Sequence, residues 1–283
     1  GVLFASIDGD ADNLVVLRTP EERAANPERL NLDKRGLRRC PLVEHEGRLR
    51  LLNYQNNAIS QISNLGNLPN LIFLDLYNNL IEDLQGELAS VTSLRVLMLG
   101  KNRIKQVSGL ETLTKLDVLD LHSNYISRVE ALDALRDLRV LNLAGNAIRV
   151  VHNLGGLRGL TELNLRRNRV EHVFELHFLP RLQRVFLSNN QVRSFDHVQC
   201  LFKSQSLLEL SLDNNPIAAD DKYRQFVVDN IPTLQHLDLK KITDEERHAT
   251  GGGGSGAGDP LAPEEISSPS HWARTRSAPR IFG

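Results

Sequence analysis

Residues 138–148, Leu138-Arg139-Val140-Leu141-Asn142-Leu143-Ala144-Gly145-Asn146-Ala147-Ile148, carry the spacing that decides the fold. Eight copies of this Leu-x-x-Leu-x-Leu-x-x-Asn-x-Ile pattern occur, with Val, Tyr or another apolar residue at a few positions. Their asparagines are Asn57, Asn79, Asn102, Asn124, Asn146, Asn168, Asn190 and Asn215, separated by 22, 23, 22, 22, 22, 22 and 25 residues. A period of this kind predicts a solenoid in which each coil is one repeat.

The chemistry of one repeat predicts the shape of its coil. Leu141 and Leu143 are two residues apart, so both point inward from a short strand, and successive strands form one parallel sheet. The Asn146 amide offers donors and an acceptor, which satisfy backbone groups where the chain leaves the sheet. From Ile148 onward, apolar residues about three apart favour a helical or 3₁₀ return segment over a second strand. We therefore expect an α/β solenoid with a curved parallel β-sheet and a short helical or 3₁₀ convex side.

Solenoids need caps over their open apolar ends, and both ends carry atypical copies of the repeat. Before the first full copy, Arg35 replaces the asparagine, and after the last copy Ile242 does. Thr243, with Glu246 three residues later, predicts the N-cap of a short helix. We expect an N-terminal extension over residues 1–27, a repeat domain with both caps over residues 28–247, and a disordered linker or tail over the Gly- and Pro-rich residues 248–283.

Composition narrows the function classes. The net charge is −1, so no global attraction draws the chain to nucleic acid or an anionic membrane, and no apolar run reaches the ~20 residues that span a bilayer. Cys40 and Cys200 are far apart and unclustered, which favours a reducing compartment. Phosphate loops, His-Glu-x-x-His, Cys-x-x-Cys and nucleophile-elbow motifs do not occur, and the nine histidines lack ligand spacing. We expect no catalytic residue, no metal site and no cofactor.

The outward strand positions should line a concave strip roughly 34 Å long, given strands about 4.8 Å apart. The central outward row contains Asn53, Asp75, Met98, Asp120, Asn142, Asn164, Phe186 and Ser211. The next row contains Gln55, Tyr77, Gly100, His122, Ala144, Arg166, Ser188 and Asp213. We expect a partner-binding site that uses Phe73, Tyr77, Met98, Asp120, His122, Asn142, Asn164, Arg166 and Phe186, because large apolar groups exposed on a sheet mark an interface.

Two features of this strip have alternative interpretations. The flanking row has valines at positions 96, 118 and 140, and these residues suit a strand whether or not they bind anything. The basic group Arg166, Arg167, Arg169 and Arg184 would receive an acidic partner or remain ordinary solvated charge, and the nearby carboxylates of Glu162 and Glu209 weaken the first alternative.

Several strings carry more than the generic repeat. The 22-residue coil resembles leucine-rich repeats of the type found in the phosphatase-1 regulatory repeat protein and an axonemal dynein light chain, and residues 223–247 resemble the cap of those proteins. Residues 18–23 (RTPEER), 27–32 (PERLNL), 49–53 (LRLLN), 71–76 (LIFLDL) and 97–104 (LMLGKNRI) more narrowly resemble the leucine-rich-repeat subunit of the tubulin polyglutamylase complex.

The narrower resemblance implies a non-catalytic scaffold at centrosomes, basal bodies and cilia or flagella. Its expected partners are a separate tubulin-tyrosine-ligase-like polyglutamylase and tubulin, in the cytoplasm and on the microtubule cytoskeleton. One alternative is a regulatory or targeting subunit of a phosphatase or axonemal dynein. A second is a ribonucleoprotein-associated repeat protein, although few exposed aromatic residues and a neutral charge argue against direct contact with nucleic acid.

Overall fold

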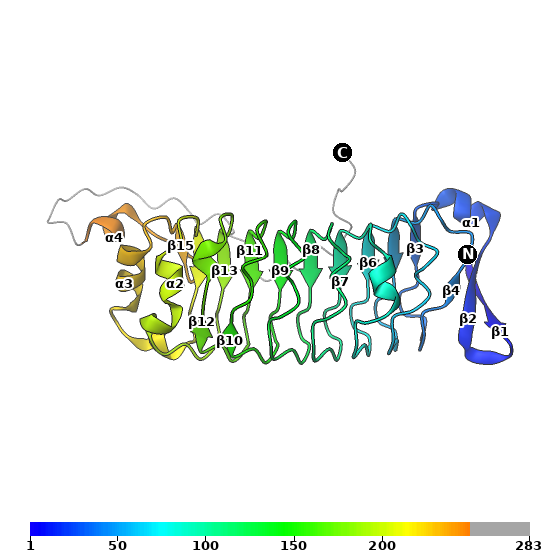
Figure 1. Ribbon diagram of the computed structural model, residues 1–283, viewed down its shortest axis with the longest axis horizontal. Coiled ribbons are helices and arrows are strands. Elements are labelled where there is room, and N and C mark those ends of the chain that lie inside the picture. The colour runs from blue at the N-terminus through cyan, green and yellow to red at the C-terminus, as the bar shows by residue number, and fades with distance from the viewer. Residues whose placement is uncertain (250–283) are drawn as a thin grey trace. The chain divides into compact units, whose positions relative to one another are not determined.

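The computed structural model describes residues 1–249, and the chain divides into two compact units, Gly1–Ile242 and Thr243–Gly283. The first unit is a solenoid built on one long sheet (Figure 1), in which the strand order is β16-β15-β14-β13-β11-β9-β8-β7-β6-β5-β3. Its strands are β3 (Arg29–Asn31), β5 (Leu51–Asn53), β6 (Phe73–Asp75), β7 (Val96–Met98), β8 (Val118–Asp120), β9 (Val140–Asn142), β11 (Glu162–Asn164), β13 (Arg184–Phe186), β14 (Glu209–Ser211), β15 (His236–Leu237) and β16 (Lys240–Lys241). Neighbouring strands from β3 to β15 are parallel, which confirms the predicted solenoid.

The core lies between the sheet and the returning segments and continues from coil to coil. In the repeat of residues 138–148, Leu138, Leu141 and Ile148 are fully buried and Leu143 is 1% exposed. Parallel pairing places Leu141 beside Leu119 and Leu163, the equivalent residues of the adjacent coils. Burying one leucine side chain contributes roughly 1.5–3 kcal/mol, and each coil gains this stabilisation only from its neighbours.

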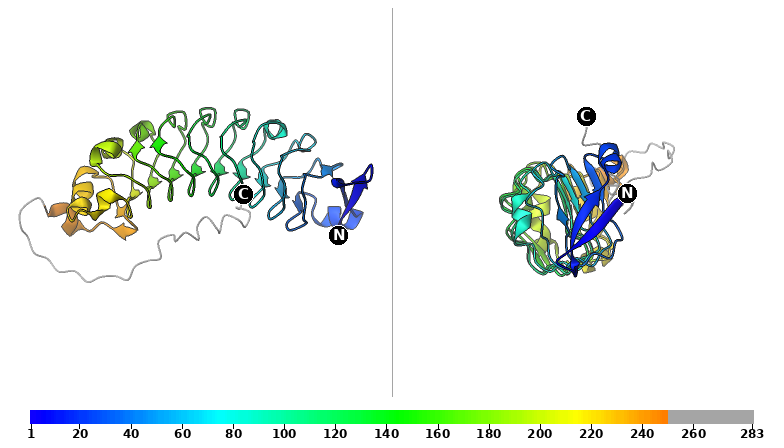
Figure 2. Two further views of the ribbon diagram at one scale, coloured as in Figure 1. Left: turned by 90° about the horizontal axis from the view of Figure 1, so that it is seen from below. Right: turned by 90° about the vertical axis from the view of Figure 1, so that its right-hand side faces the viewer.

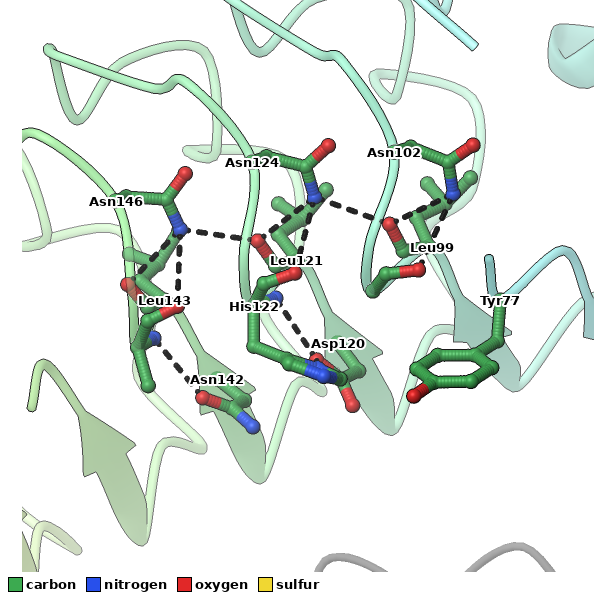
Figure 3. Close-up of polar contacts among 12 residues, drawn as sticks. Tyr77, Leu99, Asn102, Asp120, Leu121, His122, Asn124, Asn142, Leu143 and Asn146 are labelled. Carbon is green, nitrogen blue, oxygen red and sulfur yellow. Dashed lines mark hydrogen bonds and ion pairs between the residues drawn. The ribbon is translucent and has the colours of Figure 1, made fainter. Parts of the chain in front are cut away.

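The repeated asparagines form a hydrogen-bonded ladder along one edge of the sheet (Figure 3). Asn124 Nδ2 donates to the carbonyls of Leu99 (3.0 Å), Leu121 (3.0 Å) and His122 (3.3 Å), and its Oδ1 accepts from the Ile104 amide (3.0 Å). The other seven asparagines make equivalent bonds. Each amide therefore joins its own turn to the preceding coil.

This ladder supports a strained turn. The residue immediately before every ladder asparagine has a positive φ, between 53° and 68°. Only Gly145 adopts this left-handed conformation without a steric penalty, whereas Lys101, Ser123 and Arg167 do so at a cost. The four hydrogen bonds of the adjacent asparagine offset that cost, so the ladder and the turn are one structural element.

The convex side contains short helices and irregular turns (Figure 2). Its elements are η1 (Glu87–Ser90), β10 (Val150–Val151), β12 (His172–Val173), η2 (Leu176–Phe178), η3 (Phe195–Val198), α2 (Gln199–Phe202) and η4 (Pro216–Ala219). The expected helical or 3₁₀ return after Ile148 is wrong for this coil, because Val150 and Val151 pair in parallel with His172 and Val173 and residues 152–160 form turns without a helix. β-Branched residues favour this extended pairing. The 25-residue step from Asn190 to Asn215 is three residues longer than the usual coil, and the extra residues near Lys203 follow α2. The Lys203 amide closes the last turn of this helix by donating to the Cys200 and Leu201 carbonyls.

The N-terminal residues add a hairpin to the first coil. β1 (Val2–Ile7) and β2 (Asp10–Arg18) are antiparallel, and β2 pairs in parallel with β4 (Leu42–Val43). Thr19 caps the following helix α1 (Pro20–Ala25). Val16 belongs to the apolar core, and buried Arg18 donates bidentately to Glu46 (2.8 and 2.5 Å). The hairpin thus packs on the solenoid through both apolar and charged contacts.

In the C-terminal cap, a carboxylate accepts from backbone amides of the last full coil. After α3 (Tyr223–Asn230), Asp238 Oδ1 accepts from the amides of Leu212 (2.7 Å) and Asp213 (3.0 Å). Its Oδ2 accepts from the Tyr223 hydroxyl at 3.0 Å. Asp238 therefore satisfies backbone amides that follow β14.

The described part of the second unit contains α4 (Asp244–His248), which Thr243 caps as predicted by accepting from the Glu246 amide. The expected disorder of the Gly- and Pro-rich tail lies outside the described residues, apart from residues 248 and 249. Within residues 1–249, no helix combines the length and the apolar character needed to cross a membrane.

Candidate functional site

A second ladder lies on the concave face, which we define by the outward side chains of β5–β14. Five side chains of the central row accept a hydrogen bond from the amide two residues later, at 2.8–3.1 Å; they are Asn53, Asp75, Asp120, Asn142 and Asn164. All except Asn53 are buried, with exposures of 1–3%. Three predicted site residues, Asp120, Asn142 and Asn164, therefore fix a local turn by an Asx bond. The sequence did not predict this role, because these side chains were assigned only to the outward row of the concave strip.

The central part of the concave face presents two aromatic rings held across a glycine. The rings of Tyr77 and His122 are stacked with centroids 5.8 Å apart and an interplanar angle of 28°. Gly100 is the intervening residue of their row, and a Cβ at this position would lie 2.2 Å from His122 Cε1. His122 Nδ1 contacts Asp120 Oδ1 at 2.6 Å, and the Lys101 ammonium lies 5.6 Å from the Tyr77 ring. Figure 3 shows Tyr77, Asp120 and His122 together. We call this group the aromatic saddle.

The large apolar side chains do not form the exposed strip that we expected. Phe73, Met98 and Phe186 are only 4–5% exposed, so the expectation of their exposure is wrong. The physical reason at Phe73 is lateral packing, because Leu51 and Val96 flank it in register on the adjacent strands. The assignment of these residues to a partner site stays a prediction. Exposed large apolar residues lie elsewhere, at Leu3, Leu17, Tyr125, Phe174, Phe178, Phe226 and Leu239.

Towards its C-terminal end the concave face is charged and internally paired. Arg184 lies between Glu162 (3.9 Å) and Glu209 (3.5 Å). The Arg166 guanidinium lies 4.2 Å from the Phe186 ring centroid. Burial lowers the pKa of Arg166, although the carboxylates of Asp213, Glu209 and Glu162 act in the opposite direction. The predicted basic group is therefore partly neutralised within the molecule.

Several titratable side chains of the described region lie in pairs or are buried singly. Within residues 1–249, no group of three His, Cys, Asp or Glu side chains is placed to hold a metal ion. His172 lies against His197, with ring centroids 4.1 Å apart. Cys40 and Cys200 are free thiols that are both buried, and burial raises the pKa of Cys40 to about 11. These thiols therefore suit packing better than nucleophilic chemistry.

One surface hollow was missed by the sequence reasoning. It has a volume of about 450 Å³ and is lined by Glu28, Arg48, Arg50, Asn70, Ile72, Ser93, Arg95 and Lys115. These residues come from successive coils at the edge where the strands begin. Comparing equivalent positions immediately before each strand would have brought them together.

Comparisons with known proteins agree with this architecture. Family models described as "Leucine-rich repeat" and "Leucine Rich repeats (2 copies)" match residues 115–253 and residues 48–90 and 92–134, respectively. The human leucine-rich repeat-containing protein 49 is 56% identical over 252 residues, covering 86% of this chain and 37% of that protein. Its mouse counterpart is 51% identical over 59 residues, covering 21% and 9%. The chain thus spans well under half the length of these relatives.

Solved structures show the same fold. An internalin from Listeria monocytogenes has a TM-score of 0.63 and 24% identity, covering 76% of this chain and 62% of its own. A leucine-rich-repeat protein from Leptospira interrogans has a TM-score of 0.60 and 24% identity, covering 74% and 60%. The matched repeat models together extend from residue 48 to residue 253, and the chain belongs to the leucine-rich-repeat family.

Proposed function

We propose that this chain is a non-catalytic scaffold that binds a protein partner across its concave face, within a ciliary tubulin-polyglutamylating complex. The aromatic saddle is the observation that supports the binding site. Tyr77 and His122 are each half-buried. Their backbone amides donate to the side chains of Asp75 and Asp120, respectively, two residues earlier. Side chains positioned in this way lose little conformational freedom on binding. Tyrosine is also among the residues that most often dominate interface energies.

Membership of the complex has a different basis. It is supported by the strings at residues 18–23, 27–32, 49–53, 71–76 and 97–104, which resemble the leucine-rich-repeat subunit of the tubulin polyglutamylase complex. The proposed partners are accordingly a tubulin-tyrosine-ligase-like polyglutamylase and tubulin. The proposed location is the cytoplasm, at the microtubule cytoskeleton of the cilium, flagellum or basal body. In this role the chain contributes no chemistry and raises the local concentration of an enzyme near its substrate.

The binding site is tested with one tyrosine change and a matched control. Tyr77→Ala should reduce quantitative capture of the ligase-like subunit from ciliated cells at least tenfold, because it removes one ring of the saddle. The control, Tyr125→Ala, makes the same change at a residue that is 61% exposed and directly follows the ladder asparagine Asn124. Capture by this variant should stay within about twofold of wild type. Equal capture by both variants would exclude the saddle as the contact site.

The complex itself is tested by loss of the protein. Knockout cells should show reduced glutamylation of axonemal tubulin on an immunoblot, and re-expression of the wild-type protein should restore it. The purified chain should transfer no glutamate. Unchanged glutamylation, with a phosphatase or dynein subunit captured in place of the ligase, would favour the regulatory-subunit alternative. Capture of ribonucleoprotein components would favour the alternative of a ribonucleoprotein-associated repeat protein.

A further inference from the structure

The hollow lined by Arg48, Arg50, Arg95 and Lys115 has a rigid floor. The residues immediately before the strands form a row in which each amide donates to the previous carbonyl. Thus Ile72 donates to Arg50 (2.8 Å), Arg95 to Ile72 (2.8 Å) and Asp117 to Arg95 (2.8 Å). Asn70 Nδ2 donates to the Gly47 carbonyl at 2.8 Å. The side chains of this row therefore start from fixed points one coil apart.

The charges of this hollow are unbalanced. Four cationic side chains share it with one carboxylate, that of Glu28. Arg48, Arg95 and Lys115 are exposed. Within residues 1–249, no hydrogen bond or ion pair is formed by their side chains. The hollow thus concentrates positive charge on a chain whose net charge is −1.

The same row contains one arginine, Arg139, that is neutralised by a carboxylate. One coil beyond the hollow, Arg139 pairs with Asp117 through two hydrogen bonds, one of them Nη2 to Oδ2 at 2.8 Å. Arg95 is also adjacent to Asp117 in the row, but the carboxylate is engaged by Arg139 on its other side. Arg48, Arg95 and Lys115 are consequently available to a ligand, whereas Arg139 is not.

We propose that this hollow binds an extended acidic peptide segment of a partner protein. Arg48, Arg95 and Lys115 belong to coils whose strands are β5, β7 and β8, so they span about 14 Å at the usual strand spacing. An extended chain covers that distance with about four or five residues. A run of glutamates or aspartates would therefore place successive carboxylates against the cations, which are suited to carboxylate recognition.

A peptide fits this hollow better than a single-stranded nucleic acid. Binding of single strands usually combines positive charge with aromatic side chains on which bases stack. Among its lining residues, the hollow has one apolar side chain, Ile72, and no aromatic ring. This site is separate from the aromatic saddle, and the inference does not depend on membership of the polyglutamylating complex.

The experiment measures binding of a fluorescein-labelled peptide of eight glutamates to the full 283-residue chain by fluorescence anisotropy. An otherwise identical peptide of eight glutamines is the ligand control. Arg95→Glu combined with Lys115→Glu should raise the Kd at least tenfold, because both cations become repulsive. Arg103→Glu combined with Arg128→Glu changes the net charge equally at exposed residues outside the hollow. This control should stay within about twofold of wild type.

Circular dichroism of all variants establishes that they are folded. Binding should weaken several-fold when salt is raised from about 50 to about 200 mM, as expected for exposed charges. Equal loss in the two double variants would show a non-specific charge effect and overturn the proposal. Absence of binding to the glutamate peptide, equal binding of the glutamine peptide, or tighter binding of a single-stranded RNA through the same two residues would also overturn it.

Discussion

The same substitution, Asn→Asp, should strongly destabilise the first polar ladder and have little effect on the second. At Asn124 the amide nitrogen donates to three carbonyls while the oxygen accepts from Ile104. At Asn142 the oxygen accepts from the Ala144 amide, and within residues 1–249 the nitrogen donates to nothing. An aspartate preserves the acceptor and removes the donor. It therefore suits the second ladder, where Asp75 and Asp120 already perform this role.

The magnitude at Asn124 follows from which groups lose their partners. The Leu99 carbonyl keeps a bond from Asn102, the Leu121 carbonyl keeps one from Asn146, and the His122 carbonyl keeps the Lys101 amide. Asn124→Ala thus leaves only the buried Ile104 amide without a partner, which costs about 1–3 kcal/mol. Asn124→Asp keeps that acceptor but places a carboxylate against three carbonyl oxygens, and an unpaired buried charge costs about 3–5 kcal/mol.

Urea unfolding followed by circular dichroism measures the difference. With an m value of about 3 kcal/mol/M, a loss of 3 kcal/mol lowers the urea midpoint by about 1 M. Asn142→Asp should lower the midpoint by no more than about 0.3 M, because its cost is the like charge of Asp120 on the adjacent strand, about 0.2–1 kcal/mol. Asn142→Ala should cost about 0.5–1.5 kcal/mol, because it removes one hydrogen bond. Although Asn142 points outward from the sheet, it is only 3% exposed, so we do not expect its removal to be free. Equal midpoints for Asn124→Asp and Asn142→Asp would refute the distinction between the ladders.

Three further experiments probe the caps and the core. Burial alone would raise the pKa of Glu46, but hydrogen bonds and charges from Arg18 and Arg23 outweigh burial and lower this pKa from 4.5. The resulting stabilisation is present above pH 4.5 and is lost as the pH falls through the folded pKa. Glu46→Gln should therefore lower the Tm at neutral pH and flatten the decline of the Tm in acid. Cys40 and Cys200, whose pKa values burial raises, should resist iodoacetamide at neutral pH in the native protein and react in denaturant, as mass spectrometry would show. Tyr223→Phe removes the hydroxyl that donates to Asp238 and should cost about 1 kcal/mol in urea unfolding, whereas an unchanged midpoint would mean that this bond does not stabilise the cap.

The parts of the fold that follow one local rule were predictable from the sequence. Leu141, Leu143 and Asn146 are specified by a spacing that recurs in every coil, so a single repeat indicates strand, core and ladder together. The hairpin of β1 and β2 has no second copy in the chain, and its packing depends on the distant pair Arg18 and Glu46. Asp238 was missed for a similar reason, since it accepts from the amides of Leu212 and Asp213 in the preceding coil and does not follow the repeat spacing.

The candidate site was less predictable because it depends on comparisons between coils. Outward orientation does not mean exposure, since Phe73 points from the sheet yet is flanked on both sides. The aromatic saddle requires a glycine between two rings in the same row, a relation visible only after residues 77, 100 and 122 are aligned. The hollow likewise combines side chains from different coils, such as Arg48 and Arg95.

The second ladder also coincides with the positions where the concave face carries large side chains. Where the central row supplies an acceptor, the next outward residue is usually large, as at Tyr77, His122 and Arg166. Where it does not, at Met98 and Phe186, the next residues are Gly100 and Ser188. An Asx bond fixes the backbone from which the following side chain extends, so a large group there is presented with less entropy to lose on binding. In the function proposed above, the buried acceptors support recognition without contacting the partner, and a search for binding residues should begin one outward position beyond them.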